Sequence, residues 1–347
     1  MLYAGLIGLG PQWEDRYRPA LLKLRQRLRI RSVYAPVITQ AEQVSGELGC
    51  DVAPGLMALM ERNDVRALLV LDTAWYGGVP AQLACLAGKP AYLAGPLFHR
   101  APVADHLLLR AAQAGVTLMP DFAHRYTPAT SRLRELIATR LGRPLMIAVD
   151  LPLTANPAEE NGPLSTAACR ALAATIDWCT NLVGTPPAAV RGAAKGAGAA
   201  TTNVGLTEIQ VEFRRPAAGG EAPTATIRLN DSATSTALPT GSDGTAIGLG
   251  ACVQCAKGTA WLESTQHVTW ESSKEKARES LTTDRPAVEV MLDHFTRRVV
   301  GGLIPVPTLE DLCRAFQLAE TALDGIAASR GASVHISTGE QGRPPIR

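Results

Sequence analysis

The sequence lacks the long hydrophobic run that a membrane-spanning helix needs, since no uninterrupted apolar stretch reaches about 18 residues. It also lacks an excess of one charge, because the net charge of the 347 residues is only +2 and no basic run is interleaved with aromatic residues. The opening segment MLYAGLIGLG has neither a basic leader region nor a cleavage site. We therefore expect a cytoplasmic protein with no nucleic-acid partner and no membrane partner.

Cysteine is too scattered for a disulfide framework, because the count of seven is odd and the CxxC spacing occurs only once. That motif, Cys252 and Cys255, lies in a stretch typical of a strand, where residues three apart point to opposite faces. No second cysteine pair is nearby to complete a zinc site. We expect buried or half-buried reduced thiols and no metal site.

Apolar residues make up 46% of the chain, which is enough for sizeable cores, and 347 residues favour two domains. Short apolar runs alternate with amphipathic stretches over the first part of the chain. The expected strands are residues 2–8, 29–35, 65–72, 90–94 and 116–120, and the expected helices are residues 15–28, 39–48, 80–88 and 101–115. This alternation predicts a Rossmann-like doubly wound parallel sheet over residues 1–142.

The pattern changes after about residue 143, where one helical stretch is followed by strands of alternating polarity. The expected elements are a helix at 166–184, strands at 207–215, 224–231 and 267–273, and helices at 288–302 and 309–331. The pattern predicts a C-terminal α+β domain with an open antiparallel sheet over residues 143–330. A final strand, GASVHIS, and a tail are expected over residues 331–347.

A glycine turn follows the first expected strand, in the sequence GLIGLGPQWEDRYRPALL. Gly8, Gly10 and Pro11 form a loop between strand and helix, the context in which backbone amides hold a pyrophosphate. Trp13 replaces the third glycine of that pattern, and Glu14 with Asp15 places negative charge at the helix start. These carboxylates either oppose a phosphate or stabilise the helix N-terminus.

The second expected strand ends without the acidic residue that holds the adenosine ribose in such domains. Ala35 and Pro36 stand there, and no arginine follows immediately to accept a 2′-phosphate. Arg29 and Arg31 lie at the start of the strand and are interpreted as solvated residues. NAD or NADP binding is therefore expected to be weak or lost.

The sequence resembles the Gfo/Idh/MocA oxidoreductase family through almost the whole chain. The resemblance is carried by GLIGLG, LACLAGKPAYLAGPL, RYTPATSRLRELIATRLGRP and, most specifically, HFTRRVVGGLIPVPTLEDLCRAFQLAETALDGIAASRGASVHI. It implies a two-domain NAD(P)-dependent dehydrogenase of sugars, cyclitols or related compounds. By this resemblance the cofactor site would be lined by Gly8, Gly10, Pro11, Ala35, Asp72, Gly95 and Pro96.

The family's catalytic residues are missing at the matching positions. The resemblance implies Glu-Lys-Pro at the end of the fifth strand, where this chain has Ala94, Gly95 and Pro96. It also implies an aspartate and, four residues later, a proton-transferring histidine on the long helix, where this chain has Arg170 and Ala174. A methyl group cannot transfer a proton.

Other polar residues could act in their place. His124 is either a relocated acid–base or a structural histidine, and Asp72 either faces the cofactor crevice or caps a turn. Arg125, Arg170 and Asp177 are the candidate substrate-binding residues. Trp75 and Tyr76 line a cleft or cover the edge of the sheet.

Two functions remain open at this point. One is an active NAD(P)-dependent oxidoreductase with a rearranged site that uses His124 or Asp72. The other is a pseudoenzyme, a non-catalytic subunit that binds a small-molecule ligand or a partner. A homo-oligomer is expected in both cases, because the resemblance implies a subunit contact on the second sheet.

Overall fold

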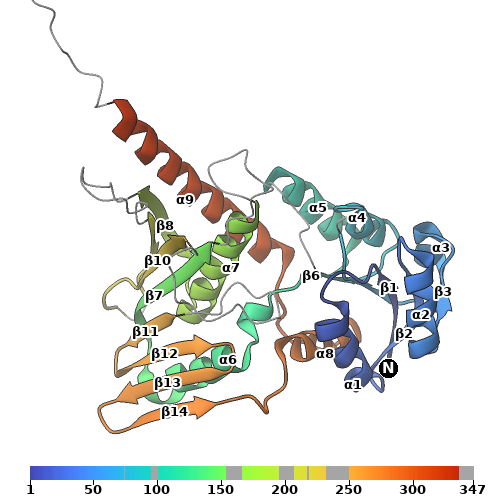
Figure 1. Cartoon of the computed structure of the whole chain (residues 1–347), viewed down its shortest axis with the longest axis horizontal. Coiled ribbons are helices and arrows are strands. Elements are labelled where there is room, and N and C mark those ends of the chain that lie inside the picture. The colour runs from blue at the N-terminus through green and yellow to red at the C-terminus, as the bar shows by residue number, and fades with distance from the viewer. Residues whose placement is uncertain are drawn as a thin grey trace, which may run out of the picture.

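The structure is a computed structural model that describes residues 1–73, 75–94, 101–153, 166–194, 207–216, 219–231 and 250–335. The chain forms two sheets with helices between and around them (Figure 1). The predicted fold class is confirmed, with one refinement of the second sheet given below.

The first sheet is parallel throughout and has the strand order β3-β2-β1-β4-β5-β6. Its strands are β1 (Leu2–Ile7), β2 (Leu28–Tyr34), β3 (Asp51–Val52), β4 (Ala67–Val70), β5 (Ala91–Leu93) and β6 (Leu118–Pro120). Its helices are η1 (Trp13–Tyr17), α1 (Arg18–Leu24), α2 (Ile38–Leu48), α3 (Leu56–Glu61), α4 (Val79–Leu86) and α5 (Ala101–Ala114). The order reverses between β1 and β4, and a doubly wound sheet binds ligands at the carboxyl ends of the strands at such a point.

Both faces of this sheet are buried, which explains why its strands are apolar without alternation. Neighbouring residues of one strand belong to different cores, as Leu6 and Ile7 of β1 do. Helix α8 (Ala287–Val299) completes one face, where Phe295 packs edge-on against Tyr92 with ring centroids 5.9 Å apart. A segment within residues 143–330 therefore packs on the N-terminal sheet, and the domain boundary at residue 142 stays a prediction.

The second sheet has eight strands in the order β14-β13-β12-β11-β7-β10-β9-β8. They are β7 (Pro144–Leu153), β8 (Pro187–Ala194), β9 (Thr207–Phe213), β10 (Thr224–Asp231), β11 (Ala251–Cys255), β12 (Gly258–Ser264), β13 (His267–Ser272) and β14 (Lys276–Ser280). Every pairing is antiparallel except that of β7 with β10, so the sheet is mixed where the sequence predicted an antiparallel one.

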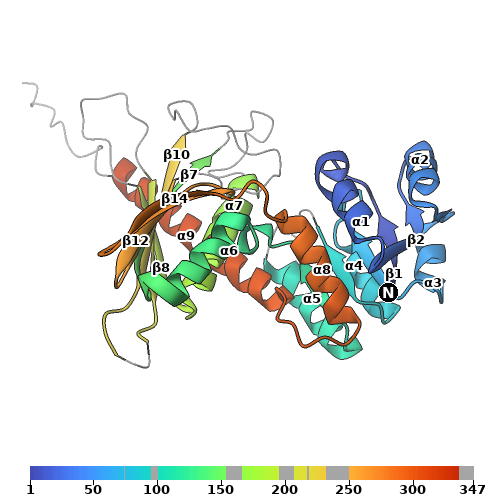
Figure 2. The ribbon, with the colours of Figure 1, turned by 90° about the horizontal axis from the view of Figure 1, so that it is seen from below.

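Helices cover one face of this sheet, and no helix of the described segments lies on the other face (Figures 1 and 2). The covering elements are α6 (Pro128–Leu136), η3 (Ile137–Leu141), α7 (Thr166–Val183) and α9 (Leu309–His335). Helix α9 approaches the β8 backbone closely, because a Cβ atom at Gly192 would lie 2.1 Å from the Ala322 carbonyl oxygen. This contact fixes α9 at the edge of the sheet.

The strand expected at residues 331–337 is wrong as far as the structure describes it, since α9 continues to His335. The alanine-rich end of this helix contains Ala327, Ala328 and Ala332, and alanine is the strongest helix former. A single glycine at position 331 does not outweigh that preference. Residues 336–347 lie outside the described part of the chain.

Candidate functional site

The glycine loop lies at the carboxyl end of β1, at the point where the sheet order reverses. Gly8 and Gly10 have φ angles of +68° and +63°, which residues with a Cβ rarely adopt. A Cβ atom at Gly8 would lie 2.7 Å from that of Asp72, and one at Gly10 would lie 3.1 Å from the Leu71 carbonyl oxygen. Glycine is therefore required twice, and the loop has the conformation expected from the sequence.

The segment after the loop differs from a phosphate-binding helix start. Residues Trp13–Tyr17 form a short π-helix, η1, before the α-helix begins at Arg18, whereas the sequence predicted a single helix over residues 15–28. Trp13 is only 4% exposed and fills the core where a third glycine would bring the helix close. Glu14 and Asp15 are exposed, and the Glu14 carboxylate pairs with Arg18 Nη1 at 3.3 Å.

Asp72 follows β4 and lies against both glycines of the loop. The Asp72 Cβ atom lies 2.7 Å from a Cβ atom built at Gly8 and 3.4 Å from one built at Gly10, which places this acidic residue beside the loop. At the opposite end of the crevice Ala35 is buried, at 6% exposed, and has no group to hold a ribose. The loop conformation suits a dinucleotide, but the residues around it do not fit one well.

The family's lysine position cannot be compared directly. Ala94 is buried at the end of β5, at 2% exposed, and Gly95 and Pro96 lie outside the described residues. Pro11, the third member of the predicted loop, is exposed.

Three predicted site residues come together at the junction of the two domains. The carboxylate of Asp177, on α7, accepts hydrogen bonds from Arg125 Nε at 2.7 Å and Arg125 Nη2 at 2.5 Å. His124 Nε2 lies 2.7 Å from Asp177 Oδ2, and Arg125 Nη2 is also 3.1 Å from Asp311 Oδ2 at the start of α9. We call His124, Arg125, Asp177 and Asp311 the junction cluster.

The three members of the junction cluster that were predicted from the sequence are buried. The side chains of His124, Arg125 and Asp177 are 7%, 13% and 5% exposed. Burial alone would raise the pKa of Asp177, but the hydrogen bonds from Arg125 and His124 outweigh it and lower that pKa. Burial acts to lower the pKa of Arg125, and its bonds to Asp177 and Asp311 raise it. The cluster is therefore built to hold Asp177 ionised.

The α7 positions matched to the family's aspartate and histidine lie on the same side of the helix as Asp177. Arg170, Ala174 and Asp177 are spaced by four and three residues, the spacing of one helical face. Arg170 and Ala174 are half-buried, and they lie two turns and one turn before Asp177. Arg170 is the only ionisable side chain of the two, and it carries no transferable proton at neutral pH.

A second buried charge cluster was missed by the sequence analysis. Arg16 Nη2, on η1, donates to Asp121 Oδ1 at 2.9 Å, and the Tyr17 hydroxyl donates to Asp121 Oδ2 at 2.5 Å. Asp121 directly follows β6 and also accepts from the Ala123 amide. We call Arg16, Tyr17 and Asp121 the brace, because it ties the segment after the glycine loop to the end of β6. The one available signal was an arginine and a tyrosine directly after a glycine loop.

The remaining sequence predictions concern metals, thiols and membranes. Among the residues that the structure describes, no group of three or more His, Cys, Asp or Glu side chains could hold a metal ion. Cys252 and Cys255 lie on opposite faces of β11, and all seven cysteines, each in a described segment, are free thiols. No helix in the described segments is long and apolar enough to cross a membrane.

Solved oxidoreductase structures are similar to nearly the whole chain. A dehydrogenase from Chromobacterium violaceum matches with a TM-score of 0.79 and 15% identity, covering 97% of this chain and 98% of its own. UDP-N-acetylglucosamine 3-dehydrogenase GnnA from Acidithiobacillus ferrooxidans matches at 0.72 and 16%, covering 94% and 98%. An oxidoreductase from Agrobacterium radiobacter, solved with NAD+, L-tartaric acid and magnesium, matches at 0.72 and 15%, covering 96% and 99%.

No family model matches the chain, and no curated protein sequence matches it either. The structural likeness, at such low identity, shows the fold alone. That fold, a Rossmann-like domain joined to a domain with a mostly antiparallel sheet, is the one implied by the family resemblance.

Proposed function

We propose that the chain is a divergent Gfo/Idh/MocA-type protein that binds a sugar-like small molecule at the domain junction and does not oxidise it. The feature that supports this proposal is the α7 face, where the family resemblance matches Arg170 and Ala174 to the family's proton-transfer residues. The next acid on that face, Asp177, has both carboxylate oxygens engaged by Arg125. A base that is buried and already ion-paired is poorly placed to accept a substrate proton.

The cofactor side of the crevice supports the same proposal. Asp72 lies against the glycine loop, Glu14 and Asp15 follow the loop in sequence, and no carboxylate follows β2 to hold a ribose. Losing a charge-assisted hydrogen bond costs about 1.5 to 3 kcal/mol, which is at least roughly tenfold in affinity. NAD and NADP therefore bind weakly or not at all, and hydride transfer requires one of them.

The first prediction is that the purified protein reduces neither NAD+ nor NADP+ with common sugars, nucleotide sugars or inositols. The physical reason is the missing acid–base group, which is worth roughly 10² to 10⁴-fold in rate. Absorbance at 340 nm measures turnover, and calorimetry measures cofactor affinity. An active dehydrogenase of the same fold serves as the positive control. Submicromolar NAD affinity together with turnover would contradict the proposal.

A second candidate function is an oxidoreductase that uses His124, and one observation favours it. Asp177 Oδ2 lies 2.7 Å from His124 Nε2, and a carboxylate in that position orients an imidazole. If turnover is found, His124→Gln separates the two candidates. Loss of kcat with unchanged thermal stability supports a catalytic His124, whereas a joint loss of stability indicates a structural one.

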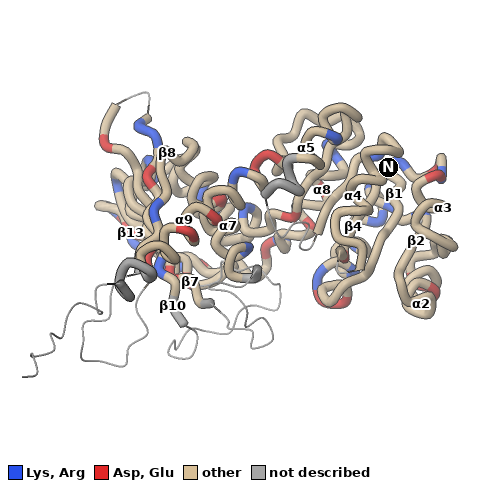
Figure 3. Tube along the Cα trace, turned by 90° about the horizontal axis from the view of Figure 1, so that it is seen from above, with Lys and Arg blue, Asp and Glu red and all other residues tan. Residues whose placement is uncertain are grey.

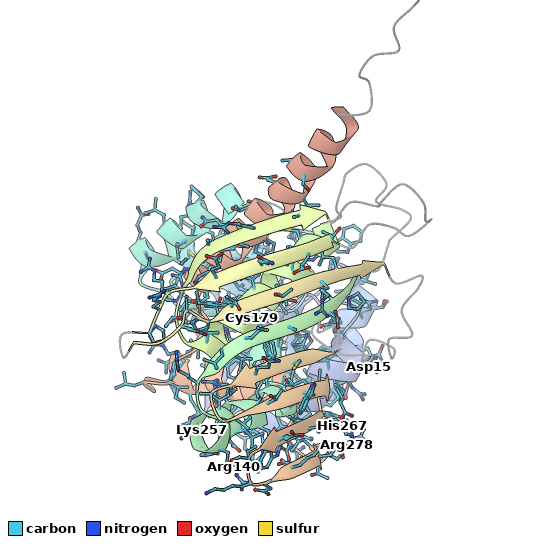
Figure 4. All side chains as sticks on the ribbon, turned by 90° about the vertical axis from the view of Figure 1, so that its left-hand side faces the viewer. Asp15, Arg140, Cys179, Lys257, His267 and Arg278 are labelled. Carbon is cyan, nitrogen blue, oxygen red and sulfur yellow. The ribbon has the colours of Figure 1, made fainter. Side chains whose placement is uncertain are left out.

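We further propose that the protein is a cytoplasmic homo-oligomer that assembles through the face of the second sheet opposite its helices. This open face carries, among others, Asp150, Gln210, Thr226, Gln254 and Trp261, and Figure 4 looks onto it with His267 and Arg278 near one edge. Figure 3 shows acidic and basic positions interspersed along the described part of the chain. The seven free thiols support a reducing compartment.

The second prediction concerns this assembly. At micromolar concentration, light scattering is expected to give a mass of two or more chains. Trp261→Arg, at a position 36% exposed in the monomer, is expected to shift that mass toward one chain, because it places a charge inside the interface. Met57→Arg, at an exposed position on α3, is the matched control and is expected to leave the mass unchanged. A monomeric wild-type protein would contradict the proposal.

A further inference from the structure

Two tyrosines meet across the crevice at the end of the first sheet. The hydroxyl oxygens of Tyr34 and Tyr76 are 2.5 Å apart, and their ring centroids are 6.1 Å apart with the planes tilted by 48°. Tyr34 is the last residue of β2, and Tyr76 lies in the loop between β4 and α4. The two strands are not neighbours, because β1 lies between them. The pair therefore spans the carboxyl end of β1.

Both tyrosines are held in place by backbone hydrogen bonds. The Gly8 amide donates to the Tyr34 carbonyl oxygen at 2.8 Å, which fixes the end of β2 beside the glycine loop. The Gly77 amide donates to the Thr73 carbonyl oxygen at 2.7 Å, and the Val79 amide donates to that of Tyr76 at 3.0 Å. These bonds form the turn that carries Tyr76 into α4. The contact thus joins two ordered segments.

The position of the pair coincides with the adenosine end of a dinucleotide site. In doubly wound sheets the pyrophosphate lies at the turn after β1, and the adenosine ribose lies at the end of β2. The residues after Tyr34 are Ala35, Pro36, Val37 and Ile38, and none has a side chain that could bond a ribose or a 2′-phosphate. The groups that recognise adenosine are absent there, and two bonded tyrosines are present.

We propose that Tyr34 and Tyr76 form a latch over the adenosine end of the crevice, so that this site selects ligands that end at the glycine loop and excludes an adenosine group. The inference rests on the proposed function, because it assumes that the crevice is the ligand site. It deepens that function by defining the ligand class as one without an adenosine moiety. The hydrogen bond between the two hydroxyls raises the pKa of Tyr34 above its ordinary value, as expected of a bond that favours the protonated phenol.

The latch can be tested with two halves of a dinucleotide. ADP probes the adenosine end, and nicotinamide mononucleotide probes the other end. Calorimetry would measure the affinity of each for the wild-type protein, Tyr76→Phe and Tyr76→Ala. Tyr76→Phe removes only the hydroxyl of a half-buried loop residue, so the fold is preserved even if Tyr76→Ala proves unstable. Trp75→Ala is the matched control, since Trp75 is the preceding residue, is 74% exposed and lies outside the pair.

We expect Tyr76→Phe to raise the affinity for ADP by roughly two- to tenfold. This factor corresponds to the net free energy of the one hydrogen bond that closes the latch. Tyr76→Ala removes the ring as well and is expected to raise that affinity by more than tenfold. The affinity for nicotinamide mononucleotide is expected to stay the same in all variants, and Trp75→Ala is not expected to raise ADP affinity.

Two results would overturn the latch. If the wild-type protein binds ADP as tightly as the variants do, the pair excludes nothing. If Tyr76→Ala weakens ADP binding, the tyrosines form a stacking surface for adenine. Neither result bears on turnover, which is the test of the proposed function, so the two proposals fail separately.

Discussion

Replacing Asp177 with alanine is expected to lower the free energy of unfolding by about 3 kcal/mol or more, because it leaves the buried Arg125 guanidinium without its main partner. Asp177 is 5% exposed and makes both of the close Arg125 contacts as well as the His124 contact. Asp311, at 3.1 Å from Arg125, remains and limits the loss. Urea denaturation followed by circular dichroism would measure the change.

Asp64→Ala is the matched control, because it removes a carboxylate from a solvent-exposed pair away from the second sheet. Asp64 Oδ2 lies 2.8 Å from Arg62 Nη2, and the two side chains are 47% and 30% exposed. Exposed pairs of this kind are worth about 0 to 1 kcal/mol. Equal losses in the two variants would show that the junction cluster does not hold the domains together.

Replacing Asp177 is also expected to change how the stability of the protein depends on pH. The pKa of Asp177 is lower in the folded protein than in the unfolded chain, so the stabilisation is fully present above the unfolded pKa of about 4 and is lost as the pH falls through the folded value. Asp177→Asn removes this titration, so its stability should decline less than that of the wild type below about pH 4. If the wild type and Asp177→Asn lose stability equally as the pH falls, Asp177 is not ionised in the folded protein.

The junction cluster shows what sequence could and could not provide. His124, Arg125 and Asp177 were each candidates from the sequence, because polar residues at a domain junction attract functional interpretations. That His124 and Arg125 both contact Asp177 depends on α7 packing against the segment after β6, more than 50 residues away in the chain. Local patterns do not encode such a pairing. Knowing the pairing matters for function, because a residue that is held in an ion pair is less available to a substrate.

The fold was predictable where local periodicity decides it. The parallel sheet follows from apolar strands separated by helices, and the glycine loop follows from Gly8 and Gly10 between a strand and a helix. The π-helix at Trp13–Tyr17 was not predictable, because it depends on Trp13 entering the core. The parallel pairing of β7 with β10 was missed for the same kind of reason, since strand order is set by packing across the whole sheet.

The contacts around the crevice support the proposal that the site differs from that of an ordinary dehydrogenase. Two places where a doubly wound sheet would hold a dinucleotide have an acidic side chain or one with another partner, namely Asp72 at the glycines and Tyr34 at the end of β2. The brace is central to this arrangement, because it fixes η1, which carries Glu14 and Asp15, beside the loop. Its removal is therefore expected to affect both stability and the shape of the crevice.

Asp121→Leu is expected to lower the free energy of unfolding by about 3 to 5 kcal/mol, because it leaves a buried guanidinium without its counter-ion. The Arg16 and Asp121 side chains are 10% and 9% exposed, and their closest atoms are 2.7 Å apart. The Tyr17 hydroxyl loses its acceptor in the same variant. Arg16→Met is expected to be similarly costly, since it leaves the Asp121 carboxylate buried. Both losses would be measured by urea denaturation.

The double variant Arg16→Met/Asp121→Leu is expected to be far more stable than the sum of the two single losses predicts. Replacing a whole buried ion pair with apolar side chains of similar size is often neutral, because both desolvation costs disappear together. A coupling energy of about 2 kcal/mol or more in this double-mutant cycle would identify the brace as an electrostatic unit. Additive losses would instead show that Arg16 and Asp121 stabilise the fold independently, Arg16 through its packing on the Tyr17 ring, 5.0 Å from the guanidinium carbon, and Asp121 through the Ala123 amide.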